Sequence, residues 1–283
     1  MKLWIVVAVM LLGLTVFAVT RGKPASSVAE KETQTLTATV GERTPVVVEL
    51  FTSEGCSSCP PADDALAQFE RTQSVAGAEV IALAQHVDYW NRLGWTDPYS
   101  HAAFSQRQGE YSQAFGKGGN VYTPQMIVDG QKEFPGGNRN LARAAIEEAA
   151  RLPKAKIEIM PREESITDKK GRTIPLRVRV GELPAVREGD TAEVLLAITE
   201  SDLSTDVPRG ENAGRRLRHP STVRHLSVLG TAGAGGEAAF ASEPSVEIGR
   251  GWRRKNLRVV VFVQERASRR VLGAKAVRLA EEQ

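Results

Sequence analysis

The chain has 283 residues, of which 41% are hydrophobic and 25% are charged. This length and composition are typical of a soluble folded protein with one large or two ordinary domains. Thirty-seven Lys and Arg residues against 34 Asp and Glu residues give a formal net charge of +3. So small an excess does not indicate electrostatic steering toward nucleic acid, and we expect no nucleic-acid partner.

The amino terminus carries an uncharged apolar run over residues 3–19. Such a run is typical of an export signal. Its length also approaches that of a membrane-spanning helix, and residues 16–18 form a passable cleavage site, so residues 1–21 are either a signal peptide or a membrane anchor. Either alternative predicts export to the periplasm or cell envelope. The polar residues 22–43 are predicted to form a flexible spacer.

An apolar strand over residues 46–50 is predicted to lead into a Cys-Ser-Ser-Cys sequence and a helix that begins near Pro60. The first N–H groups of a helix carry the positive end of its dipole and favour a thiolate over a thiol. Cys56 is therefore the candidate nucleophile. Cys59, one turn further on, is the candidate residue that resolves a mixed disulfide formed at Cys56. The acidic neighbours of the pair moderate the lowering of the Cys56 pKa that we expect.

Cys56 and Cys59 are the only cysteines of the chain. Export would permit a disulfide, and a bridge over two intervening residues closes too small a loop to add much stability, so thiol–disulfide exchange is the leading interpretation. Exchange requires that the sulfurs be reachable from solvent, and burial of both beneath side chains would rule against the proposed enzyme. A structural disulfide and a thiol site for copper or zinc are the alternatives; zinc would need two further ligands, and the four histidines are scattered. We expect no metal and no cofactor.

Up to residue 153, strand patterns alternate with helix patterns. A second strand is predicted over residues 79–87 and a second helix over 98–114, where apolar residues recur at helical spacing. Residues 121–130 contain a short apolar strand that stops at an Asp-Gly turn, which is typical of a hairpin. Asn138 is predicted to cap a last helix that ends near Ala150.

From residue 154 onward, short β-rich runs are separated by turn-forming residues. This pattern predicts a second, β-sandwich-like domain over residues 154–283, with the first domain at residues 44–153. The predicted strands are residues 156–160, 176–180, 193–199, 222–229, 246–248, 257–264 and 271–279.

The order of elements in the first domain resembles the thioredoxin fold. The resemblance implies an α/β thioredoxin-like domain followed by the all-β domain. It also implies that Pro124 is cis and lies beside the dithiol, with Thr123, Pro124 and Gln125 positioning the substrate chain. Glu49 is similar in type and approximate place to the buried acid that assists the second thiol of thioredoxins, which implies a proton relay at this residue.

Several longer motifs resemble the exported thioredoxin-like family catalogued as domain of unknown function 1223. They are GCSSCPPAD, HVDYWNRLGWTDPYS, RQGEYS, VYTPQMIVDG and GENAGRRLRH. The resemblance supplies no established reaction. Within it, His86 lies at the end of the second strand and Tyr89, Trp90 and Trp95 follow that strand. These four residues are expected to shape a binding surface, although burial is the commoner fate of aromatic residues.

Two functions follow from these patterns. The first is an exported thiol-disulfide oxidoreductase-like protein that exchanges disulfides with an unidentified protein thiol or disulfide, with possible membrane attachment through residues 3–19. The second is a noncatalytic envelope protein that binds a ligand or partner, in which Cys56 and Cys59 form an inert bridge.

Overall fold

The computed structural model describes residues 43–161, 173–233 and 238–279. The predicted signal or anchor at residues 1–21 and the predicted spacer, apart from Arg43, lie outside these ranges. In the described ranges, no helix has both the length and the apolar character needed to cross a membrane.

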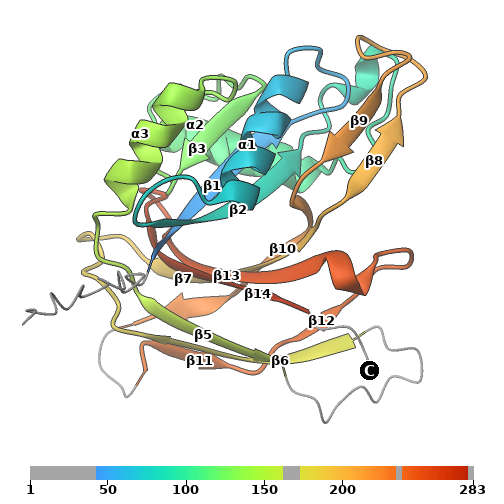
Figure 1. Ribbon diagram of the computed structural model, residues 1–283. Coiled ribbons are helices and arrows are strands. Elements are labelled where there is room, and N and C mark those ends of the chain that lie inside the picture. The colour runs from blue at the N-terminus through green and yellow to red at the C-terminus, as the bar shows by residue number, and fades with distance from the viewer. Residues whose placement is uncertain (1–42, 162–172, 234–237, 280–283) are drawn as a thin grey trace, which may run out of the picture. The chain divides into compact units, whose positions relative to one another are not determined.

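Strands dominate the described part of the chain (Figure 1). The first half contains β1 (Thr44–Thr52), α1 (Pro60–Thr72), β2 (Ala78–His86), η1 (Asn91–Leu93), α2 (Ala102–Ala114), β3 (Gln125–Val128), β4 (Lys132–Pro135) and α3 (Arg139–Ala149). The second half contains β5 (Lys156–Pro161), β6 (Thr173–Gly181), β7 (Ala192–Glu200), β8 (Leu203–Asp206), β9 (Arg216–His219), β10 (Thr222–Ala232), β11 (Phe240–Ser242), β12 (Ser245–Glu247), η3 (Arg254–Asn256), β13 (Leu257–Glu265) and β14 (Val271–Arg278).

One mixed sheet joins the two halves of the chain. Its eight strands run in the order β14-β13-β7-β10-β2-β1-β3-β4. β1 and β2 are parallel, so that Thr52 lies opposite His86, and β3 runs antiparallel to β1. β10 continues the sheet beyond β2, with Thr222 opposite Ala84. β5, β6, β11 and β12 form a second, smaller sheet, and β8 pairs only with β9.

The predicted fold class, a helix-flanked thioredoxin-like domain followed by a separate β sandwich, is wrong. The described residues are mostly β, with three α-helices and one large mixed sheet that contains strands from both halves. Within residues 44–153 alone, one edge of β2 would be unpaired. The prediction failed because β10, from the second half of the chain, pairs with that edge. The backbone N–H of Ala84 donates to the carbonyl of Ser221 at 3.0 Å. Sequence periodicity locates strands but does not say which edges pair.

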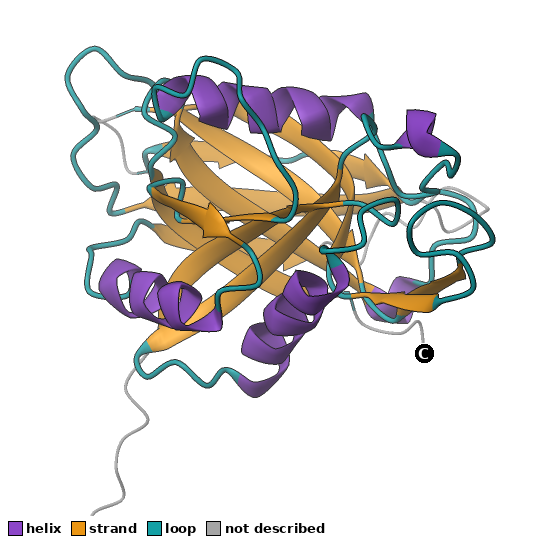
Figure 2. Ribbon diagram, turned by 90° about the horizontal axis from the view of Figure 1, so that it is seen from above, coloured by secondary structure: helices purple, strands orange, loops and turns teal. Residues whose placement is uncertain are grey.

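Both faces of the large sheet are covered by helices in its β1–β2 region (Figure 2). On one face, alternate residues of β1 pack with apolar residues of α1 and α3; on the other, the intervening residues face α2. This second face also holds Leu195 and Phe262 from β7 and β13, packed with Ile81 of β2 and Phe104 of α2. The core is thus continuous between the halves of the chain. Because successive side chains of a strand point to opposite faces of the sheet, only every second residue of β1 lies on the face that carries α1 and the cysteine pair.

Candidate functional site

Cys56 and Cys59 form a disulfide at the start of α1. The N–H of Cys59 donates to the carbonyl of Cys56 at 3.2 Å, and Pro60 begins the helix where its missing N–H has no cost. The predicted Cys-x-x-Cys helix start is therefore confirmed. The expectation of solvent-reachable sulfurs is not met in this conformation, because Cys56 is 1% exposed and Cys59 is fully buried.

The loop between β8 and β9, residues 207–215, packs against the cysteine loop; we call it the closing loop. The Asn212 amide is fully buried and donates to two backbone carbonyls, those of Glu54 at 2.8 Å and Cys56 at 2.9 Å. The Glu211 carboxylate accepts from the N–H of Ser57 at 2.9 Å. Two side chains from a segment far along the chain thus fix the backbone on both sides of Cys56.

The Thr123–Pro124 peptide bond is cis, as the resemblance implied. Trp90 connects this bond to the cysteine loop: its indole N–H donates to Thr123 Oγ1 at 2.8 Å, and its Cβ lies against Gly55. On the other side, a Cβ added to Gly136 would lie within 3.3 Å of both Ala62 and Pro124, so the backbone at Gly136 fits closely between α1 and the proline. Thr123 and Pro124 are therefore held close to the start of α1.

A set of buried polar side chains lies beneath the disulfide; we call it the buried polar cluster. His86 Nδ1 lies 2.7 Å from Asp97 Oδ2, and the N–H of Glu54 donates to the same Asp97 oxygen at 2.8 Å. His219 Nε2 lies 2.8 Å from Glu54 Oε1, and the two histidine rings are 4.9 Å apart. The cluster consists of Thr52, Glu54, Asp63, His86, Asp97 and His219, each less than a tenth exposed.

A ring nitrogen of the cluster has no hydrogen-bond partner among the described residues. His86 Nε2 is buried and makes no hydrogen bond within the described part of the chain, whereas the Thr52 hydroxyl and the Asp63 carboxyl interact with each other. A buried polar atom without a partner costs roughly 1–3 kcal/mol, so leaving this nitrogen unpaired destabilises the folded protein. Such a cost is characteristic of groups that exchange protons or bind a ligand.

Burial and neighbouring charges shift the pKa values of this cluster. Burial raises the pKa of Asp63 to about 7, although the positive charge of His86 opposes the shift. Burial also disfavours charged His86, but Asp97, Asp63 and Glu54 outweigh it and raise the His86 pKa above its ordinary value. Burial lowers the pKa of His219. Near neutral pH, Asp63 can therefore both give and accept a proton.

Asp63 lies one helical turn after Cys59, and its N–H donates to the Cys59 carbonyl at 3.1 Å. Residues four apart share one face of a helix, and this face is buried against β1 and β2. From the sequence, Asp63 is only one of the acidic neighbours of the cysteines. Its spacing from Cys59 was the signal that could have identified it.

Glu49, the predicted proton relay, lies on the other face of β1. Its carboxylate accepts from Arg107 at 2.7 and 2.9 Å, from Gln85 at 2.5 Å and from the Tyr111 hydroxyl. Arg107 also donates to Gln264 of β13 at 2.9 Å. These contacts make Glu49 part of a buried network that ties α2 to the large sheet, and none of them involves a cysteine.

The remaining predicted residues also make internal contacts. The Gln125 amide bonds to Gln108 at 2.9 Å and to Glu133 at 3.0 Å. The Tyr89 hydroxyl donates to Gln108 at 3.1 Å, and the Trp95 indole donates to Glu54 at 2.7 Å. Trp90, Trp95 and His86 of this set thus touch the cysteine loop, the cis peptide bond or the buried polar cluster, and the Tyr89 hydroxyl also interacts with Thr123. In the described ranges, no three His, Cys, Asp or Glu side chains are arranged to hold a metal ion.

The fold and the site define a mixed α/β protein with a buried Cys-x-x-Cys disulfide that is closed over by a distant loop. The chain belongs to the protein family of unknown function DUF1223, whose model matches residues 47–264. No curated protein matches the chain.

Among solved structures, the chain is similar to protein AGR_C_4864 from Agrobacterium tumefaciens, with 24% identity and a TM-score of 0.62 over 86% of this chain and 97% of that one. This likeness shows a shared fold. A domain of the outer membrane lipoprotein Omp28 from Porphyromonas gingivalis, at 12% identity and a TM-score of 0.25, covers 47% of this chain and 93% of its own; this match is too weak to inform the fold.

Proposed function

We propose that this protein is a gated thiol–disulfide exchange protein: the Cys56–Cys59 bond is redox-active, and the closing loop must move before a partner can reach it. The observation that carries the proposal is the position of Asp63, a buried carboxyl one helical turn from Cys59 in a cluster where His86 Nε2 has no hydrogen-bond partner among the described residues. A purely structural bridge needs no such cluster, and its four-residue ring adds little stability.

The exchange can be written from the side chains present. With the closing loop open, the Cys56 thiolate attacks one sulfur of a partner disulfide, and the other partner sulfur leaves as a thiolate that takes up a proton. Cys59 then gives its proton to the Asp63 carboxylate and attacks the Cys56 sulfur. The Cys56–Cys59 bond forms, and the second partner sulfur leaves as a thiolate that takes up the proton held by Asp63. Two electrons pass to the partner; the reverse sequence oxidises a partner dithiol.

Thr123 and Pro124 support the proposal as the surface for the partner chain, because Trp90 and Gly136 hold them near the start of α1. Export through residues 1–21 would place the protein where disulfides persist, and it stays a prediction.

The second candidate is a noncatalytic protein with a structural disulfide. The observation that favours it is the complete burial of the pair. The two candidates differ in the expected reactivity of the reduced thiols. Exchange predicts that Cys56 reacts faster than Cys59, and a structural disulfide predicts no such difference.

The test compares Cys59→Ser with Cys56→Ser, each incubated with oxidised glutathione and followed by mass spectrometry. Exchange predicts that Cys56, left alone in Cys59→Ser, forms a mixed disulfide at least about ten times faster than Cys59 in Cys56→Ser, because a helix start activates the first thiol. The reduced wild-type protein should instead close its own disulfide without accumulating the glutathione adduct. Equal rates in both variants, or two unreactive thiols, would support the structural alternative.

A further inference from the structure

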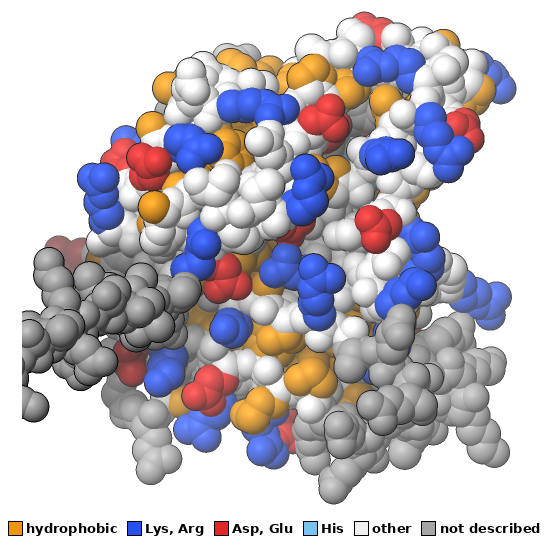
Figure 3. All heavy atoms as spheres, viewed as in Figure 1, with side chains coloured by type: hydrophobic (Ala, Val, Ile, Leu, Met, Phe, Trp, Pro, Cys, Tyr) orange, Lys and Arg blue, Asp and Glu red, His pale blue; other side chains and the backbone are white. Residues whose placement is uncertain are grey.

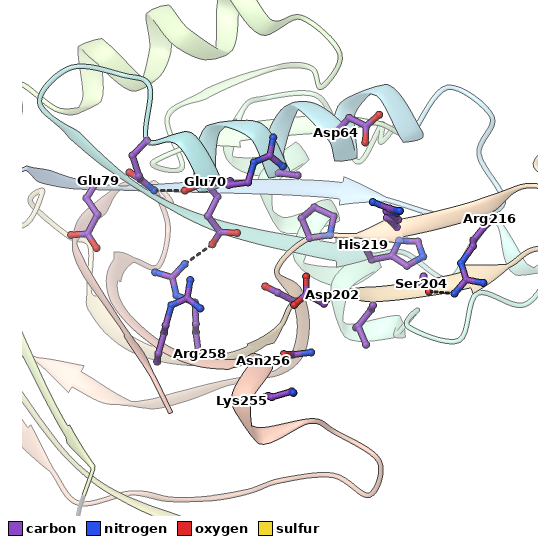
Figure 4. Close-up of a pocket in the computed structure, with 18 of the residues that line it drawn as sticks. Asp64, Glu70, Glu79, Asp202, Ser204, Arg216, His219, Lys255, Asn256 and Arg258 are labelled. Atoms are coloured by element: carbon purple, nitrogen blue, oxygen red, sulfur yellow. Dashed lines mark hydrogen bonds and ion pairs between the residues drawn. The ribbon is translucent and has the colours of Figure 1, made fainter. Parts of the chain in front are cut away.

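A large groove lies between α1, the β8–β9 hairpin and the segment around η3. Its volume is about 920 Å³. Figure 4 shows Asp64 and Glu70 on α1, Arg216 on the hairpin and Lys255 on the facing wall. The groove is also lined by His219, a member of the buried polar cluster, so it adjoins the site described above.

Cations predominate along this groove. Figure 3 shows Lys and Arg side chains around a hollow on this face, with fewer Asp and Glu side chains between them. Glu70 is already neutralised, because Arg258 lies 2.5 Å from its carboxylate and Ser221 donates to it. Four exposed cations from four different elements line the groove and make no ion pair with a described residue: Arg71 of α1, Arg218 of β9, Lys255 of η3 and Arg278 of β14.

We infer that this groove binds an acidic segment of another polypeptide. Four unneutralised cations around one concavity make a positive potential that favours a ligand with several separated negative charges. The volume exceeds what a single small anion would fill. The inference goes beyond the proposed function, because it holds whether or not the disulfide exchanges.

The carboxylates of the groove favour a polypeptide over a nucleic acid. Asp64, Glu79 and Asp202 lie along the same walls as the cations. A nucleic acid carries a negatively charged phosphate at every nucleotide, so some of its phosphates would lie against these carboxylates and be repelled. A polypeptide can place acidic residues at the cations and neutral or basic residues at Asp64 and Asp202.

The hairpin gives the groove a physical link to the disulfide. Ser204, Arg216 and Arg218 lie on β8 and β9, and the closing loop joins these two strands. A bound acidic segment would therefore contact the hairpin whose loop covers Cys56. The contacted hairpin residues lie only a few positions along the chain from that loop.

The test measures binding of a fluorescein-labelled deca-glutamate peptide to the folded protein by fluorescence anisotropy at low ionic strength. The variant Arg71→Ala/Arg218→Ala/Lys255→Ala should bind this peptide about ten-fold more weakly, as expected for the loss of three exposed charge pairs. Added salt should weaken wild-type binding further.

The matched control is Arg92→Ala/Arg151→Ala/Lys156→Ala, which removes three exposed cations outside the groove. It lowers the net charge equally and should keep wild-type affinity within about two-fold, since surface charges at a distance are screened. Equal weakening in both triple variants would overturn the inference, as would no measurable binding to the wild type. Binding of a deca-thymidine oligonucleotide as tight as that of the peptide would overturn it too.

Discussion

An Asp63→Asn variant should exceed the wild type in free energy of unfolding by about 4 kcal/mol at about pH 8, and the difference should fall to roughly 0.5 kcal/mol near pH 4. The Asp63 pKa is about 7 in the folded protein and has an ordinary value of 3.8, which we take for the unfolded chain. Between these values the folded state holds a proton that the unfolded state has lost, so wild-type stability falls as pH rises toward 7. At 1.36 kcal/mol per pKa unit, the full loss is about 4 kcal/mol.

Urea unfolding from about pH 4 to pH 8 measures this difference, and Asp64→Asn is the matched control. Asp64 is the next residue but is exposed, so its variant should stay within about 0.5 kcal/mol of the wild type throughout. His86 acts in the same direction: its raised pKa gives stability below pH 6.5 that is lost as pH rises through the folded value. A pH-independent effect of Asp63→Asn would show that Asp63 is not a buried carboxyl that titrates near neutrality.

An Asn212→Ala variant should lose its disulfide to dithiothreitol about thirty times faster than the wild type. The change removes two hydrogen bonds, to the carbonyls of Glu54 and Cys56, each worth roughly 1 kcal/mol, so the closing loop should open more often. A shift of about 2 kcal/mol in that equilibrium corresponds to the stated factor. Thiol alkylation at timed intervals gives the rate.

Arg216→Ala is the control for the hairpin itself. Arg216 bonds to Asp206 and Ser204 on the neighbouring strand and makes no contact with the cysteine loop. Its reduction rate should match the wild type. If Asn212→Ala also reduces at the wild-type rate, the closing loop does not control access to the disulfide and the gating mechanism fails.

Local sequence patterns predicted most of the helices and strands, and they predicted the Cys56–Cys59 pair at a helix start. The helix at Pro60 and the Asn138 cap follow from residue types with strong backbone preferences, whereas the cis Pro124 was implied by the resemblance to the thioredoxin fold. The pairing of β2 with β10 could not be predicted in this way, because it joins segments more than a hundred residues apart and neither sequence marks its partner. That pairing is what turns two expected domains into one continuous sheet.

The β8–β9 hairpin was missed for a different reason. Its strands, Leu203–Asp206 and Arg216–His219, are short and mostly polar, so they lack the apolar alternation that marks a strand. The closing loop therefore had no predicted position, and the burial of Cys56 could not be anticipated.

Glu49 was predicted as the proton relay, but its side chain points to the face of β1 that is turned away from the cysteine helix. Glu49 and Thr52 are three residues apart and point to opposite faces of β1, so Thr52 lies with Asp63 and His86 on the α1 side while Glu49 lies with Arg107. The flanking strand residues are apolar on both faces, and the sequence gives no indication of which face meets the cysteine helix. Asp63 takes the relay position in the proposed mechanism.

The reduction potential of the Cys56–Cys59 disulfide, measured by equilibrating the folded protein with dithiothreitol buffers and counting alkylated thiols, tests redox activity most directly. Thiol–disulfide exchange predicts a potential above about −300 mV, in the range of bonds that form and break during a reaction. A potential well below that value would contradict it and leave Cys56 and Cys59 as a structural bridge.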